Sequence, residues 1–82
     1  MTMVKLLTMF DIDWKQFKSY RGEEESLDGD EVIEAFCKAE YTLDNLSVLY
    51  EIAKNGTHFM KKLFEKVLLV LPDDLRLWVE MQ

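Results

Sequence analysis

The stretch THFMKKLFEKVLLVL, residues 57–71, is the most strongly patterned part of the sequence. Its apolar residues recur at intervals of three and four positions, as on one broad face of a helix: Phe59, Met60, Leu63, Phe64, Val67, Leu68 and Leu71. Thr57 is suited to cap the start of that helix, and Pro72 cannot continue it without losing a backbone hydrogen bond. The pattern predicts a helix over 57–71 at the centre of the core.

Two further helices are predicted between residues 28 and 56. Asp28 and Glu31 have the spacing of a capping box, and an apolar stripe follows at Val32, Ile33, Phe36 and Cys37. Thr42 can cap the next helix, whose apolar face consists of Leu43, Leu46, Leu49, Tyr50 and Ala53. Asn55 and Gly56 are expected to supply the left-handed backbone that ends this helix.

The aromatic residues near the amino end predict another helix. Trp14, Phe17 and Tyr20 recur at three-residue spacing, which stacks them on one face of a helix over 12–21. Asp11 or Asp13 can cap its start, because a carboxylate there accepts hydrogen bonds from free backbone N–H groups.

The carboxyl end allows two interpretations. Asp73 or Asp74 can cap a last short helix that carries Leu75, Trp78 and Val79. Leu77, Val79 and Met81 also alternate as a strand would, and Val4, Leu6, Thr8 and Phe10 could alternate as its partner. The predicted fold class is all-α, a small single-domain bundle of four to five short helices. An α+β fold with short N- and C-terminal strands is the alternative.

Length and composition fit one small folded domain. The chain has 82 residues, of which 49% are hydrophobic, with three glycines and one proline. This composition favours a packed helical core over disorder or a turn-rich β-sandwich. We expect a single helical domain over 1–82 with an acidic connector at about 22–30.

Cysteine content, apolar runs and net charge bear on the compartment in which the protein acts. The single cysteine, Cys37, cannot form an internal disulfide, which indicates a reducing compartment. No N-terminal segment has the form of a secretion signal, and the longest apolar run, Val67 to Leu71, is far too short for a membrane span. A formal charge of −6 disfavours a direct grip on nucleic acid, since that contact depends on Lys and Arg. We expect a cytoplasmic protein without membrane insertion.

An acidic segment is the first candidate for a binding surface. Seven carboxylates lie within residues 23–34: Glu23, Glu24, Glu25, Asp28, Asp30, Glu31 and Glu34. Displayed on one surface, they could imitate a row of DNA phosphates or attract a basic partner. A solvated connector is the alternative interpretation of the same residues.

Aromatic residues are the second candidate for a binding surface. The group consists of Trp14, Phe17, Tyr20 and Trp78, and it exceeds what a small core can easily enclose. Exposed aromatic side chains are common anchors of protein interfaces, although packing in the core is the usual place for such residues. Self-association of the chain through the same surface is an open alternative.

The sequence offers little that resembles a catalytic or metal site. It lacks a phosphate-binding glycine loop, a nucleophile elbow and a dinucleotide fingerprint. The single histidine, His58, lies at a predicted helix start, and neither it nor Cys37 has a second ligand at metal-binding spacing. We expect no catalytic residue, no metal and no cofactor, and therefore no enzyme.

The opening MTMVKLLTMFDIDWK, residues 1–15, together with the length and the acidic helical character, resembles the RIII family of lysis-inhibition accessory proteins of T-even phages. The resemblance implies a protein of the host cytoplasm that delays lysis by binding the cytosolic part of a holin or antiholin complex. It assigns no functional residue, because it rests on no diagnostic motif.

The expected function is therefore non-catalytic regulation or inhibition of another protein by binding it, with lysis inhibition as the specific form that the resemblance implies. The alternative is an acidic inhibitor, of a DNA-mimic or anti-defence type, that occupies the basic groove of a nucleic-acid-binding host protein. Salt separates the two, because a phosphate mimic releases its partner sharply as salt rises.

Overall fold

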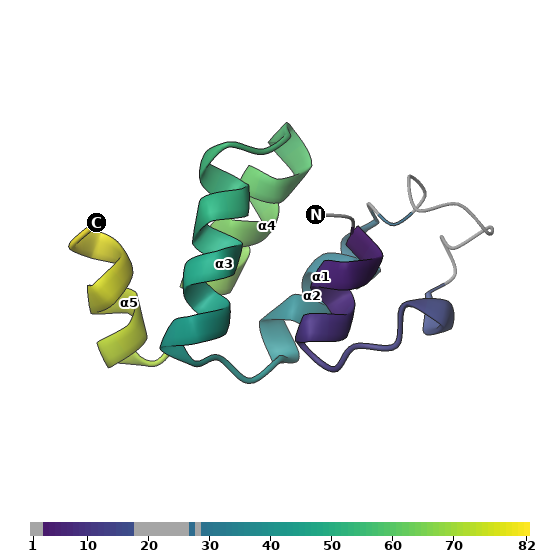
Figure 1. Ribbon diagram of the computed structural model, residues 1–82, viewed down its shortest axis with the longest axis horizontal. Helices are drawn as coiled ribbons and strands as arrows, with labels where there is room; N and C mark the ends of the chain where they lie inside the picture. The colour runs from purple at the N-terminus through teal and green to yellow at the C-terminus, as the bar shows by residue number, and fades with distance from the viewer. Residues whose placement is uncertain (1–2, 18–26, 28) are drawn as a thin grey trace. The chain divides into compact units, whose positions relative to one another are not determined.

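The computed structural model describes residues 3–17, 27 and 29–82 (Figure 1). Its elements, in chain order, are α1 (Met3–Met9), the 3₁₀ turn η1 (Trp14–Gln16), α2 (Asp30–Lys38), α3 (Leu43–Lys54), α4 (His58–Leu68) and α5 (Asp73–Glu80). Every regular element among the described residues is a helix, which confirms the all-α prediction. The α+β alternative is not favoured, because both segments that alternate in sequence form helices, α1 and α5.

The chain divides into two compact units, Met1–Ala39 and Glu40–Gln82. The single domain expected over 1–82 stays a prediction. Most of the acidic connector expected at about 22–30 lies outside the described residues.

The first unit has an apolar core drawn from α1, α2 and the segments between them. Phe10 and Phe36 meet edge to face in it, with ring centroids 5.2 Å apart and planes inclined by 72°. The buried apolar residues of this unit are Leu6, Leu7, Phe10, Phe17, Leu27, Val32, Ile33 and Phe36. The stripe predicted on α2 is thus buried except at Cys37, which is half-buried.

Helix α1 ends in a left-handed residue that is not glycine. Asp11 has a φ of 59°, and its backbone N–H donates to the Thr8 carbonyl at 3.0 Å. The N–H of Ile12 donates to the Leu7 carbonyl at 2.9 Å, so the two bonds together form a Schellman motif. Aspartate tolerates this conformation better than most residues, because its short polar side chain bonds locally.

The helix predicted over 12–21 is not formed as expected. Asp13 caps only the 3₁₀ turn η1, where its carboxylate accepts from the Lys15 N–H at 3.0 Å. Phe17 already has extended backbone, with a φ of −79° and a ψ of 136°. Residues 18–21 lie outside the described part of the chain. Phe17 has extended backbone and its side chain is nevertheless buried, so its place in the core does not require a helix.

Helix α2 begins two residues later than the predicted cap. Gly29 is the N-cap residue and makes no side-chain cap bond, while Asp30 and Glu31 lie in the first turn. Carboxylates there interact favourably with the positive end of the helix dipole. The predicted cap, Asp28, lies outside the described residues.

In the second unit α3 and α4 form a helical hairpin (Figure 1). Thr42 and Asn45 form a capping box at the start of α3: the Asn45 N–H donates to the Thr42 hydroxyl at 3.3 Å, and the Thr42 N–H donates to the Asn45 side-chain oxygen at 2.8 Å. Thr57 caps α4 by accepting from the Met60 N–H at 3.4 Å. Both predicted N-caps are confirmed.

The connection between α3 and α4 differs from the prediction in its backbone. Asn55 has a φ of −108°, and the φ of Gly56 also lies outside the left-handed region, so neither residue is left-handed. The glycine is required for space instead. A Cβ there would collide with the Ile52 carbonyl oxygen and would lie 3.2 Å from the Met60 Cβ.

The core of the second unit is formed mainly by α3 and α4. Its buried residues are Leu46, Leu49, Ala53, Met60, Leu63, Phe64, Val67, Leu71 and Leu75. Leu43, predicted on the apolar face of α3, is 52% exposed because it occupies the first turn at the helix end. Helix α4 ends at Leu68 rather than at residue 71, and a turn leads to Pro72.

Helix α5 starts differently from the prediction. Pro72 is its N-cap residue, whereas Asp73 and Asp74, the predicted caps, are the first helical residues and make no cap bond. Proline has no N–H to lose, and its fixed φ suits the entry to a helix. Leu75 is the buried residue of α5, while Trp78 and Val79 are half-buried.

Candidate protein-binding surfaces

The structure places three of the seven acidic candidates, all of them on α2. Asp30 and Glu34 are exposed one turn apart on the side of α2 opposite Val32 and Phe36, and Glu31 is half-buried. The Glu34 carboxylate forms an ion pair with Lys38 at 3.0 Å. Glu23, Glu24, Glu25 and Asp28 lie outside the described residues. A continuous acidic surface over 23–34 stays a prediction.

The four aromatic candidates have different environments. Trp14 is half-buried in η1, with the Lys15 ammonium 5.5 Å from its ring centroid. Phe17 belongs to the core of the first unit, so its surface is occupied by intramolecular packing. Tyr20 lies outside the described residues. Trp78 is half-buried on α5, in the second unit.

Trp78 belongs to an aromatic cluster that joins three helices. Its ring meets the Tyr50 ring edge to face, with centroids 6.0 Å apart and planes inclined by 79°. Tyr50 of α3 also contacts Phe64 of α4, with centroids 5.8 Å apart. Edge-to-face pairs of this kind contribute about 0.5–1.5 kcal/mol beyond the area they bury. The cluster therefore contributes to the packing of α5 against α3.

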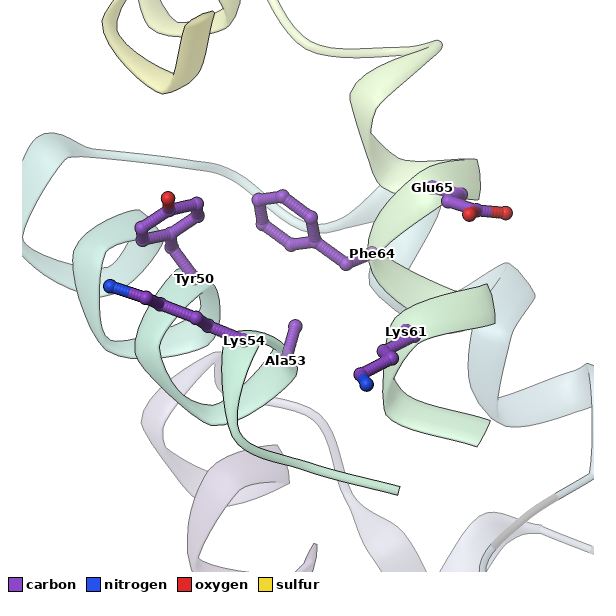
Figure 2. Close-up of a pocket in the computed structure, with 6 residues that line it drawn as sticks. All are labelled: Tyr50, Ala53, Lys54, Lys61, Phe64 and Glu65. Atoms are coloured by element: carbon purple, nitrogen blue, oxygen red, sulfur yellow. The ribbon is translucent and has the colours of Figure 1, made fainter. Parts of the chain in front are cut away.

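A shallow pocket of about 280 Å³ lies beside this cluster, between α3 and α4. Figure 2 shows Tyr50 and Phe64 directed toward each other from the two helices, while Glu65 points away from them. The Lys54 ammonium lies 6.0 Å from the Tyr50 ring centroid. The pocket thus combines aromatic walls with lysine side chains at its edge.

The outer side of α5 presents apolar side chains to solvent. Leu77 and Met81 are 55% and 75% exposed, and they lie four residues apart on one helix face. Asp73, Asp74 and Glu80 are exposed beside them. We call these five residues the α5 outer face. At 100° per residue, Asp73 and Glu80 flank the apolar pair on one side and Asp74 flanks it on the other.

Two further large apolar side chains are exposed in the turn that precedes α5. Leu69 and Val70 in this turn are 75% and 52% exposed. Leu69 also lines a hollow of about 250 Å³ together with Leu68, Arg76, Val79 and Glu80. Glu80 belongs both to this hollow and to the α5 outer face, but Val79 lies about 160° around the helix axis from Leu77, so the hollow is on another side of α5 than the apolar pair.

Arg76 holds α5 to the end of α4, a role that the sequence analysis did not assign. Its Nε donates to the Leu68 carbonyl at 3.2 Å, and a terminal nitrogen donates to the Leu71 carbonyl at 3.1 Å. The other terminal nitrogen lies 3.8 Å from the Asp73 carboxylate. Carbonyls at a helix C-terminus lack intrahelical donors and carry partial negative charge, so a guanidinium satisfies them well.

The single histidine and the single cysteine were the other side chains considered as ligands or nucleophiles. His58 is exposed as the first residue of α4, and Cys37 is half-buried on α2. Among residues 3–17, 27 and 29–82, no three His, Cys, Asp or Glu side chains gather as metal ligands would. In the same part of the chain, no helix combines the length and apolar character that crossing a bilayer needs.

No family model, curated protein or solved structure matches the chain.

Proposed function

We propose that the chain is a non-catalytic phage-type accessory protein that regulates or inhibits another protein by binding it. The observation that carries the proposal is the exposed apolar pair Leu77 and Met81 on the α5 outer face. Large apolar side chains that gather on a surface, rimmed by polar residues, are typical of protein-binding sites. The half-buried Trp78 on the same helix adds an aromatic contact of the kind that anchors interfaces.

The specific form of the proposal is lysis inhibition in the host cytoplasm. Residues 1–15 and the acidic helical character support it through their resemblance to the RIII family of T-even phages. The partner is then the cytosolic part of a holin or antiholin complex.

A lysis assay tests this form directly. Cells that express a T-even holin are compared with cells that express the holin and the chain together, and the time of lysis is recorded. Wild-type chain should delay lysis. A Leu63→Asp variant should not, since Leu63 is fully buried and a charge there unfolds the second unit. Unchanged lysis time at equal levels of folded wild-type chain would refute the lysis-inhibition form.

The second candidate function, an acidic inhibitor of a nucleic-acid-binding host protein, is favoured by the net charge of −6 and by exposed Asp30 and Glu34 on α2. A pull-down washed at low and then high salt separates the candidates. The comparison uses wild type and a variant neutralised at Glu23, Glu24, Glu25, Asp28 and Asp30. A lysis protein retained under both treatments supports lysis inhibition, whereas a nucleic-acid-binding protein lost under both supports the acidic inhibitor.

A further inference from the structure

We infer that the α5 outer face docks one amphipathic helix of the partner, with an apolar stripe flanked by lysines or arginines. The inference rests on the proposed function, because it names the chemistry of the bound segment.

The apolar part of the face has the form of a helix-docking surface. Leu77 and Met81 follow each other along the axis of α5 and are both exposed. From Asp73 to Met81 the face is about 12 Å long, of which the apolar pair spans about 6 Å, from a rise of 1.5 Å per residue. The whole face fits two to three turns of a partner helix, whose apolar residues at i and i+4 would lie against the pair.

The charge of the face selects the partner. Asp73, Asp74 and Glu80 surround the apolar pair, and α5 contains no lysine. The one cation of the helix, Arg76, donates to the Leu68 and Leu71 carbonyls and lies near Asp73. Its charge is therefore directed back onto the chain. Complementary charge on the bound helix must be positive, and acidic helices would be repelled.

Contacts with the rest of the second unit hold the face, and such contacts lower the entropic cost of binding. Leu75 anchors α5 in the core, Trp78 packs on Tyr50, and Arg76 ties the helix to the end of α4. A surface that is already ordered loses little conformational freedom when the partner docks.

Two matched synthetic helices test the inference with the full chain. One peptide of about 14 residues carries a leucine stripe flanked by lysines, and the other carries the same stripe flanked by glutamates; this length is near the minimum for a helix in water. Binding is measured by fluorescence anisotropy of a dye on each peptide. The lysine peptide should bind at least about tenfold more tightly than the glutamate peptide.

Variants assign the binding to the face. Leu77→Glu and Met81→Glu should each weaken the lysine peptide by about tenfold or more. Leu43→Glu is the matched control, because Leu43 is exposed to a similar degree on another helix. Neutralising the flank with Asp73→Asn, Asp74→Asn and Glu80→Gln should remove the preference for lysine over glutamate. Circular dichroism checks that each variant keeps its helices.

Three results would overturn the inference: equal binding of the two peptides, an equal loss with Leu43→Glu, or a dimer in sedimentation that Leu77→Glu dissociates. The last would assign the face to a second copy of the chain. Failure of the inference differs from failure of the proposed function. If wild type and Leu77→Glu delay lysis equally, the inference alone is wrong; if wild type binds the lysine peptide at the face without delaying lysis, only the lysis-inhibition form is wrong.

Discussion

Asp11 adopts a backbone conformation that most residues avoid, and its replacement tests the Schellman motif at the end of α1. Its φ of 59° costs a β-branched residue more than aspartate or glycine. Asp11→Val should lower the free energy of unfolding by about 1–2 kcal/mol, whereas Asp11→Gly should change it by less than about 0.5 kcal/mol. Urea titration followed by circular dichroism measures both. Equal stability of the valine variant would show that the motif is not formed in solution.

Arg76 offers a second test at the scale of one residue. Arg76→Met keeps the length of the side chain but removes its hydrogen bonds to the Leu68 and Leu71 carbonyls. We expect a loss of about 1–2 kcal/mol in the free energy of unfolding, because these two carbonyls, at the end of α4 and in the turn after it, lose a charged donor. Arg76→Lys should lose less stability than Arg76→Met, because it keeps a charged donor, but more than wild type, because an ammonium lacks the planar fork of the guanidinium.

Lys61 on the exposed side of α4 provides the control for Arg76. Lys61→Met should change the stability by less than about 0.5 kcal/mol. Similar losses in both variants would mean that Arg76 contributes through its general charge rather than through its hydrogen bonds.

At the scale of elements, the α3–α4 connection depends on the absence of a side chain at Gly56. A Cβ there collides with the Ile52 carbonyl oxygen of the preceding helix. Gly56→Ala should therefore lower the free energy of unfolding by about 1–3 kcal/mol. Asn55→Ala, which removes only the bond from the Asn55 side chain to the Glu51 carbonyl, should cost less than about 1 kcal/mol. A Gly56→Ala variant as stable as wild type would contradict the close approach of residue 56 to the Ile52 carbonyl oxygen.

Sequence patterns predicted best the helices whose caps and apolar faces agree. Thr42 and Thr57 cap α3 and α4 as expected, because each hydroxyl precedes an apolar repeat of helical period. The same logic failed over residues 12–17, the described part of the helix predicted over 12–21. The three-residue spacing of Trp14 and Phe17 also fits a 3₁₀ turn that is followed by an extended residue. Phe17 has this extended backbone and is still buried, and tertiary packing decides that burial.

The candidate site was less predictable than the fold. Leu77 and Met81 belonged to the alternating pattern of a possible strand, and the sequence did not show that they would be exposed. A sequence shows that a side chain is apolar but not whether a neighbour covers it. The role of Arg76 depends on the carbonyl of Leu68 at the end of α4 and that of Leu71 in the turn, which only the folded turn brings within reach. The position of Arg76 four residues after Pro72 gave no signal of that contact.

At the scale of the whole molecule, each of the two compact units contains one tryptophan. Trp14 lies in the first unit and Trp78 in the second. Units of about 40 residues rarely fold alone without disulfides or metals. We expect one cooperative unfolding transition. The fluorescence of a Trp14→Phe variant reports the second unit and that of a Trp78→Phe variant the first, and their urea midpoints should agree once each variant's own change in total stability, measured by circular dichroism, is subtracted. Different midpoints by fluorescence and by circular dichroism within one variant would instead show that the units unfold independently.

Exposure also decides which methionines an oxidant reaches first. Met81 is 75% exposed and Met9 41% exposed, whereas Met60 is 6% exposed within the core of the second unit. Conversion of a thioether to a sulfoxide makes an apolar side chain polar. Mild peroxide should therefore alter the α5 outer face while the core stays intact, leaving a chain that is folded but chemically changed at the surface that we propose for binding.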